Sequence, residues 1–190
     1  MLRSALLCLA FALLSGCASM ADRLRGSLTP PPGRAYAILS LTGKAFNPDL
    51  ATVGMSVRDA QGRVAAEDAA SLLTDTVFGE EGMSPVEGKL VLLDLPPGDY
   101  RLAGVWGHWS EDGVFGSDLK MKQFRLDAPF HLDAGETVYL GQVQLEMSFL
   151  PEVKLGDERK RDFGHMRRVW KIPDLSRVAV RPLRLAGPRP

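Results

Sequence analysis

The chain has 190 residues, 23 basic and 23 acidic side chains, a formal net charge of zero and only two cysteines, Cys8 and Cys17. This length fits one domain that buries a sizeable core without covalent cross-links. Because both cysteines lie near the N-terminus, the rest of the chain excludes a disulfide framework, a thiolate zinc site and a cysteine nucleophile.

The N-terminus carries the pattern of a secretory signal. Arg3 is followed by the apolar run "LLCLAFALLSG", which is too short for the roughly 20 residues of a membrane-spanning helix. The run ends in Leu14-Ser15-Gly16-Cys17, which resembles the lipobox of bacterial lipoproteins. The resemblance implies a signal peptide over residues 1–16 and lipidation of Cys17. With Ala18 as the next residue, it also implies sorting to the outer membrane rather than the inner one. A plain secretory signal with an incidental cysteine is the alternative.

Residues 17–34 are predicted to form a lipidated, proline-rich tether, because "TPPPG" favours an extended and semi-rigid backbone. A single domain is expected over residues 35–190. No further stretch approaches the length of a membrane-spanning helix, so we expect this domain to be soluble outside its anchor.

From Ala35 onward the dominant period of apolar residues is two, which is typical of β-strands with one buried face. Candidate strands cover residues 52–59, 89–95, 100–106, 121–126, 137–149 and 177–185. The run "KLVLLDL" is apolar on both faces, as in a central strand. Alternation places Trp106 on the same face as Tyr100, and Tyr139 on the same face as Val143. Short alternating segments separated by Gly, Pro and Asp turns predict a mainly β fold, an antiparallel β-sandwich.

Two stretches have helical character. Residues 68–78 are ambiguous between helix and strand. Residues 157–170 are a stronger candidate, because Phe163, Met166 and either Val169 or Trp170 lie on one helical stripe, although one glycine interrupts it. Acidic residues at the start of this segment and basic residues near its end suit the helix dipole. We therefore expect one short C-terminal helix before a closing strand.

The segment "LLDLPPGDYRL" (92–102) predicts a strand, a tight turn and a second strand, with Gly98 supplying a positive φ angle at the turn. It resembles the "LPPGxYxL" hairpin of bacterial prealbumin-like β-sandwich domains, such as the carboxypeptidase-regulatory-like modules. The segment "FHLDAGETVYLGQVQLE" (130–146) resembles a strand pair of small bacterial envelope lipoproteins. These resemblances cover about residues 89–185. They imply a prealbumin-like or Ig-like sandwich and bring no catalytic residue to this chain.

Residues that catalyse reactions or bind metals are present, but not in a recognised pattern. His108, His131 and His165 lack the spacing of metal ligands, and we expect His131 on an exposed strand face. No serine lies in a Gly-x-Ser-x-Gly elbow, and adjacent carboxylate pairs suit solvated turns. We predict no catalytic residue, no metal, no cofactor and no enzymatic activity. The alternative is an envelope hydrolase or metal-dependent enzyme that uses His108 with the nearby acids Glu111 and Asp112.

The segment "GVWGHWSEDGVFGSD" (104–118) is predicted to be a long loop between two strands. Loops at the ends of β-sandwiches commonly carry binding residues. We predict that His108, Trp109 and Glu111 form a contact surface, with Trp106 in the core. The alternative for Trp109 is that it plugs the end of the sandwich.

Charge is distributed unevenly, since the residues from Lys154 to the end contain eleven Lys/Arg and only four Asp/Glu. Either this basic part packs on the acidic remainder of the chain, or it forms a surface for anionic lipid headgroups or a polymer.

The sequence predicts a lipoprotein on the periplasmic face of the bacterial outer membrane that acts as a non-enzymatic binding or interaction module. Its expected partners are the membrane and an envelope protein or glycan, with no nucleic acid. An accessory structural subunit of an envelope assembly is the alternative.

Overall fold

A computed structural model describes residues 19–113 and 116–187 of the chain. The predicted signal peptide and Cys17 lie outside the described residues. No helix in the described ranges is long and apolar enough to cross a membrane.

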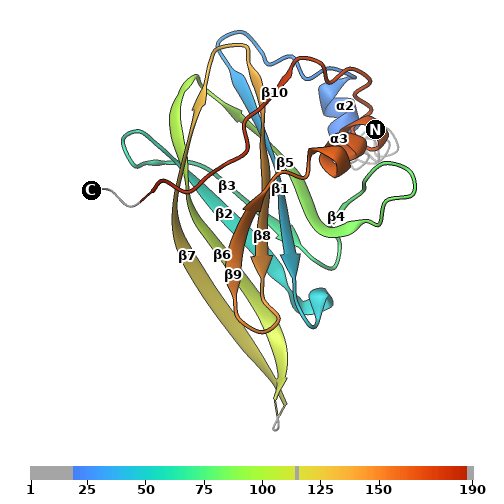
Figure 1. Ribbon diagram of the computed structural model, residues 1–190, viewed down its shortest axis with the longest axis vertical. Coiled ribbons are helices and arrows are strands. Elements are labelled where there is room, and N and C mark those ends of the chain that lie inside the picture. Colours follow the sequence, from blue (N-terminus) through green and yellow to red (C-terminus); the bar gives the residue numbers. More distant parts are fainter. Residues whose placement is uncertain (1–18, 114–115, 188–190) are drawn as a thin grey trace, which may run out of the picture.

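The described chain forms two β-sheets that pack face to face (Figure 1). Sheet A has the strand order β10-β8-β1-β5-β4, with β9 also paired to β8, and sheet B has the order β3-β2-β6-β7. The strands of sheet A are β1 (Ala35–Lys44), β4 (Thr76–Val77), β5 (Val86–Leu95), β8 (Thr137–Glu146), β9 (Glu152–Gly156) and β10 (Val178–Val180). Those of sheet B are β2 (Thr52–Asp59), β3 (Val64–Ser71), β6 (Gly98–Gly113) and β7 (Gly116–Leu132). The helical elements are α2 (Met20–Leu24), α3 (Arg159–Arg168) and the short 3-10 helix η1 (Pro48–Leu50).

The mainly β, sandwich-like fold is confirmed, but sheet A is mixed rather than antiparallel. Strands β1 and β10 both run parallel to β8. The pairing of β10 follows a crossover through α3, because parallel neighbours need a long connection instead of a hairpin. Strand β10 pairs with the first half of β8 and β9 pairs with the second half, so the two short strands share one edge.

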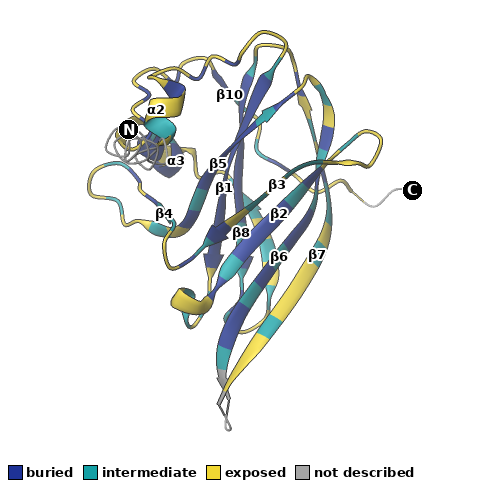
Figure 2. Cartoon of the chain, turned by 180° about the vertical axis from the view of Figure 1, so that it is seen from behind, coloured by how far each residue is buried: buried dark blue, intermediate teal, exposed yellow. Residues whose placement is uncertain are grey.

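The core between the sheets is apolar. Its fully buried members include Leu39, Leu41, Val53, Met55, Leu102, Val105 and Leu145. Strand β5 is buried on both faces, as its sequence predicts: Val91 and Leu93 face sheet B, while Leu90 and Leu92 face away from it. The dark central strands in Figure 2 show this double burial.

A second core lies on the other face of sheet A, beneath α2, α3 and the segment after α3. It contains Ile38, Leu90, Tyr139, Met166, Trp170 and Ile172. The predicted C-terminal helix is confirmed as α3. Gly164, which weakens the helical pattern, is needed there because a Cβ atom would lie 2.5 Å from the backbone nitrogen of Glu80. The glycine therefore allows α3 to approach the β4–β5 connection closely.

The segment predicted as a tether is packed from Ser19 onward. Ser19 caps α2, and Leu24 and Leu28 are buried in the second core. Burial of these two leucines against Trp170 and its neighbours ties residues 19–28 to the domain, so only Ala18 separates Cys17 from the folded chain.

The ambiguous segment 68–78 is extended in the structure. It ends β3, turns and forms β4, so its helical spacing is not used. Cross-strand pairing with β2 and β5 supplies the backbone hydrogen bonds that an isolated helix of this length does not retain in water.

The predicted hairpin at residues 92–102 is an arch between the two sheets, because β5 belongs to sheet A and β6 to sheet B. The positive φ angle of Gly98 is present, at 152°. The Tyr100 hydroxyl donates a hydrogen bond to the carbonyl of Pro96 over 2.7 Å and closes the arch. The positive φ predicted for Gly98 is confirmed, but Gly98 is the first residue of β6 rather than the corner of a tight turn, and the two strands do not pair with each other.

Two bulges reverse the predicted orientation of aromatic side chains. Between Leu102 and Gly104, β6 carries one residue more than β2, so Val105 rather than Trp106 faces the core. Trp106 lies instead on the outer face of sheet B, over Gly54. In β8 a shift at Gly141, whose φ is 87°, sends Tyr139 to the face opposite Val143.

Candidate functional site

The β6–β7 hairpin is the longest element of the molecule and extends beyond the sandwich (Figure 1). The two strands remain paired as far as Gly113 and Gly116. Pairing of β6 with β2 ends at His108, so the distal part of the hairpin has two strands only. The prediction of a loop over residues 104–118 is therefore wrong.

Glycines in this segment serve close packing rather than loop flexibility. A Cβ atom added to Gly104 would lie 3.1 Å from Ser56 Oγ. A Cβ atom added to Gly107 would overlap the core side chains of Leu145 and Met147. A glycine-rich strand of this kind resembles a loop in sequence, which explains the error.

The three residues predicted as one contact surface are split between the two faces of the hairpin. Trp109 points into the sandwich, with 3% of its surface exposed, and its Nε1 donates to Glu111 Oε1 over 2.8 Å. His108 lies on the opposite face, where its ring is nearly parallel to that of Trp106, with the centroids 6.1 Å apart. The structure thus brings Trp109 and Glu111 together, places Trp109 as a plug at the end of the core, and leaves His108 apart.

The hairpin exposes two large apolar residues that the sequence interpretation did not select. Leu119 and Met121 are each 75% exposed. Their partners across the hairpin are Ser110 and His108, so both side chains lie on the outer face of sheet B. The available signal was the alternation "LKMK", in which apolar side chains occupy one face and lysines the other.

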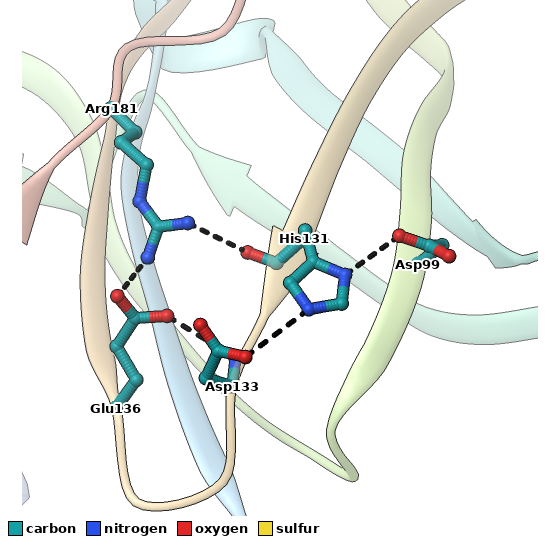
Figure 3. A network of polar contacts seen from close by, with 5 residues as sticks. All are labelled: Asp99, His131, Asp133, Glu136 and Arg181. Atoms are coloured by element: carbon teal, nitrogen blue, oxygen red, sulfur yellow. Dashed lines mark hydrogen bonds and ion pairs between the residues drawn. The ribbon is translucent and has the colours of Figure 1, made fainter.

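A polar network lies at the other end of the same hairpin (Figure 3). The Nδ1 atom of His131 is 2.7 Å from Asp99 Oδ1, and Nε2 is 3.3 Å from Asp133 Oδ1. Arg181 pairs with Glu136 and donates to the His131 carbonyl oxygen over 3.4 Å. The hydrogen bond to Asp99, supported by Asp133, raises the pKa of His131 above its usual value.

His131 is half exposed, as predicted, and both of its ring nitrogens are occupied by carboxylates. This arrangement holds a proton on the imidazole and leaves no ring nitrogen to act as a base toward a substrate. The network links the start of β6, the end of β7 and the segment after β10.

A second polar network is buried beneath α3. Asp162 Oδ2 accepts hydrogen bonds from Ser40 Oγ and from the Tyr139 hydroxyl, each over 2.6 Å. Asp162 Oδ1 pairs with Arg161 at 2.8 Å, and Arg161 also donates to Ser40 Oγ. Burial, together with the adjacent carboxylate of Asp162, raises the pKa of Tyr139. Because Asp162 is fully buried, this network joins α3 to β1 and β8 rather than meeting a substrate.

His165 lies beside that network. Its Nδ1 accepts the backbone N–H of Phe78 over 3.0 Å. Burial, followed by the charges of Arg161 and Arg168, lowers the pKa of His165 to about 4. The neutral imidazole is therefore the form that fits this site at neutral pH.

The three histidines lie in separate places: on the outer face of sheet B, at the end of β7, and on the buried side of α3. Within residues 19–113 and 116–187, no group of three or more His, Cys, Asp or Glu side chains is arranged to hold a metal ion. Nor does any hydrogen bond among these residues join His108 to Glu111.

No family model matches the chain, and no curated protein matches it either. One solved structure, a leucine-rich repeat protein from Bacteroides thetaiotaomicron, is similar to 64% of this chain with 13% sequence identity and a TM-score of 0.34. The matched region spans 14% of that protein. A likeness at this level supports no statement about fold or function.

Proposed function

We propose that the protein is a lipoprotein anchored in the outer membrane, facing the periplasm, and that it acts as a non-enzymatic binding or interaction module. The observation that carries the binding role is the β6–β7 hairpin, which extends from the end of the sandwich opposite α2 (Figure 1). It presents Leu119 and Met121 to solvent on a two-stranded, regular element. Large apolar side chains exposed side by side are typical of interaction surfaces.

The polar residues support binding rather than catalysis. The His131 imidazole is already bonded to Asp99 and Asp133. The Asp162 carboxylate is already bonded to Ser40 and Tyr139. His108 stacks with Trp106 and has Met121 as its cross-strand neighbour, which suits contact with a partner more than proton transfer. The proposed partner is an envelope protein or glycan.

Photo-cross-linking in intact cells tests this proposal. A photoreactive phenylalanine derivative replaces Leu119 in the full chain, and a matched chain carries it at Leu73, which is 60% exposed on the turn between β3 and β4. We expect a specific cross-linked product from position 119 and not from position 73. The same products from both positions, or none from position 119, would contradict a binding role for the hairpin.

Anchoring is tested separately at Cys17. We expect Cys17→Ala to abolish fatty-acid labelling and to move the protein out of the membrane fraction, because the lipobox resemblance makes this cysteine the acylated residue. Undiminished labelling would overturn the lipoprotein assignment while leaving the hairpin test unaffected.

A second candidate function, an accessory structural subunit of an envelope assembly, is favoured by one further observation. Phe46, Leu50, Phe149 and Leu150 are exposed at the hairpin end of the molecule, and the rings of Phe46 and Phe149 form an edge-to-face pair with centroids 4.8 Å apart. A permanent subunit would cover this surface continuously. Co-purification of one partner in fixed ratio, without cross-linking, would favour the subunit over a transient binding module.

We propose that the domain is a prealbumin-like or Ig-like sandwich. Its support is the arch closed by the Tyr100 hydroxyl on the Pro96 carbonyl, a tyrosine contact of the kind that Ig-like sandwiches use to fix a turn between sheets.

A further inference from the structure

The folded chain begins very close to the cysteine proposed as the lipid anchor. Ser19 is the N-cap of α2: its Oγ accepts the backbone N–H of Asp22 over 3.2 Å, and its own backbone N–H donates to Asp22 Oδ2 over 3.1 Å. Leu24, at the end of α2, is buried in the second core. Cys17 precedes Ser19 by two residues, and two residues span at most about 7 Å. An acyl group on Cys17 would therefore keep the start of α2 near the bilayer, while the orientation of the domain depends on what else contacts the surface.

Unpaired cations surround this point of attachment. Arg23, Arg25 and Lys171 are exposed, and none of them forms an ion pair within the described residues. The turns that carry them adjoin, since a Cβ on Gly26 would lie 3.7 Å from the Lys171 carbonyl oxygen. The one acidic side chain of α2, Asp22, is occupied by its hydrogen bonds to Ser19. We call Arg23, Arg25 and Lys171 the anchor-side cations.

Two of these cations occupy backbone positions that favour glycine. Arg25 has a φ of 50° and Lys171 a φ of 59°, and they are the non-glycine residues with positive φ in the described part of the chain. Glycine adopts this left-handed region without the steric cost that a side chain brings. Folding alone therefore favours glycine at both positions, whereas the chain places a positive charge at each.

We infer that the anchor-side cations rest on the anionic phospholipid headgroups of the bilayer that holds the acyl chains of Cys17. This inference rests on the proposed lipidation. It orients the domain, because the hairpin extends from the opposite end of the molecule and is then directed away from the membrane, toward its partners (Figure 1).

Charge complementarity gives the expected size of the effect. A Lys or Arg close to an anionic membrane surface contributes roughly a fivefold gain in the population bound to it. Removing two cations should lower the membrane-facing population by about 25-fold relative to other orientations. Salt well above 0.1 M should have a similar effect, because screening then acts within about 10 Å.

The experiment uses the full, acylated chain in vesicles of phosphatidylethanolamine and phosphatidylglycerol that contain brominated lipid. With Cys17 acylated, a new cysteine is the single free thiol of the mature chain. A fluorophore is attached at Ser27→Cys, next to α2, or at Leu119→Cys on the hairpin. We expect the brominated lipid to quench the first probe and not the second. Quenching at Ser27 should weaken in high salt and in vesicles of phosphatidylcholine.

The decisive variant is Arg25→Gly/Lys171→Gly. We expect it to lose most of the quenching at Ser27 while its melting temperature stays constant or rises, because glycine suits both backbone positions. A purely structural role for the two side chains would instead lower the melting temperature. The matched control, Lys120→Gln/Lys122→Gln, removes the same charge from the hairpin and should leave quenching at Ser27 unchanged.

Equal quenching of both probes, or undiminished quenching in the double glycine variant of an acylated chain, overturns docking on anionic lipid and leaves the anchor standing. An intact mass without an acyl group overturns the anchor and the docking together.

Discussion

The two faces of sheet A are both buried, but in different ways. The face toward sheet B meets apolar side chains such as Leu102 and Val105. The face toward α3 combines apolar packing with a buried network, in which Asp162 joins Ser40 of β1 to Tyr139 of β8. Apolar contacts are non-directional, whereas hydrogen bonds to one carboxylate fix the position of a helix over two strands. Sheet B is therefore held on sheet A by the packing of apolar side chains, whereas α3 is held by specific hydrogen bonds as well.

The largest effect is expected from disrupting the buried polar network between α3 and sheet A. Asp162→Ala would leave the Arg161 charge, which is 5% exposed, without its partner and two hydroxyls without their acceptor. We expect a loss of about 3–5 kcal/mol in the free energy of unfolding, measured by urea denaturation. Arg161→Met/Asp162→Leu should recover much of the loss, because it removes both charges together. A loss below about 1 kcal/mol for Asp162→Ala would mean that α3 is held by apolar contacts alone.

The apolar face of sheet A is tested at Trp109, at the end of the core between the sheets. Trp109 is buried between the sheets, so Trp109→Ala should cost about 3–4 kcal/mol. Trp106→Ala is the matched control, because the bulge in β6 places Trp106 on the outer face of sheet B, and it should cost clearly less. Thermal or urea unfolding of both variants checks the difference. Equal losses would contradict the reversal of faces caused by the bulge.

The sequence predicted elements whose pattern is local. The double burial of β5 and the stripe of α3 follow from the spacing of apolar residues within a single segment. The faces of Trp106 and Tyr139 do not, because one extra residue in a strand reverses every side chain beyond it. A bulge depends on how strands pair, so alternation within one strand cannot reveal it.

The polar sites were less predictable for a different reason. Ser40 and Asp162 are 122 positions apart, and neither has a sequence neighbour that indicates a buried network. Trp109 and Glu111, which are two residues apart on one strand face, were found together because their proximity is local. The anchor-side cations were visible only as part of the excess of basic residues near the C-terminus and as two arginines in the predicted tether.

The third expected effect is a pH dependence that arises from the polar side of sheet A. Burial lowers the pKa of His165 to about 4, against an ordinary value of 6.5. A lowered pKa in the folded state means that the unfolded chain binds more protons between these values. Stability from the neutral imidazole is therefore complete above about pH 6.5 and is lost as the pH falls toward 4. The loss should be on the order of 3 kcal/mol.

Unfolding at a series of pH values between 4 and 7 measures this loss. His165→Gln keeps a side-chain acceptor for the Phe78 N–H but does not titrate, so its unfolding free energy should vary less over the same range. An identical pH dependence in the wild type and in this variant would assign the effect to the carboxylates instead.

The smallest effect is expected from His131, whose pKa shifts in the opposite direction from that of His165. This histidine is exposed, and its bonds to Asp99 and Asp133 raise its pKa instead of lowering it. Any stability that it contributes is present below the unfolded pKa of about 6.5 and is lost as the pH rises through the folded value. Solvent screens an ion pair of this kind, so His131→Gln should leave the melting temperature almost unchanged at pH 5 and at pH 8.

Titration followed by NMR should show that Asp99→Asn lowers the pKa of His131 more than Asp133→Asn does, because the Asp99 contact is 2.7 Å and the Asp133 contact 3.3 Å. The reverse order would indicate that Asp133 is the principal partner of the imidazole in solution.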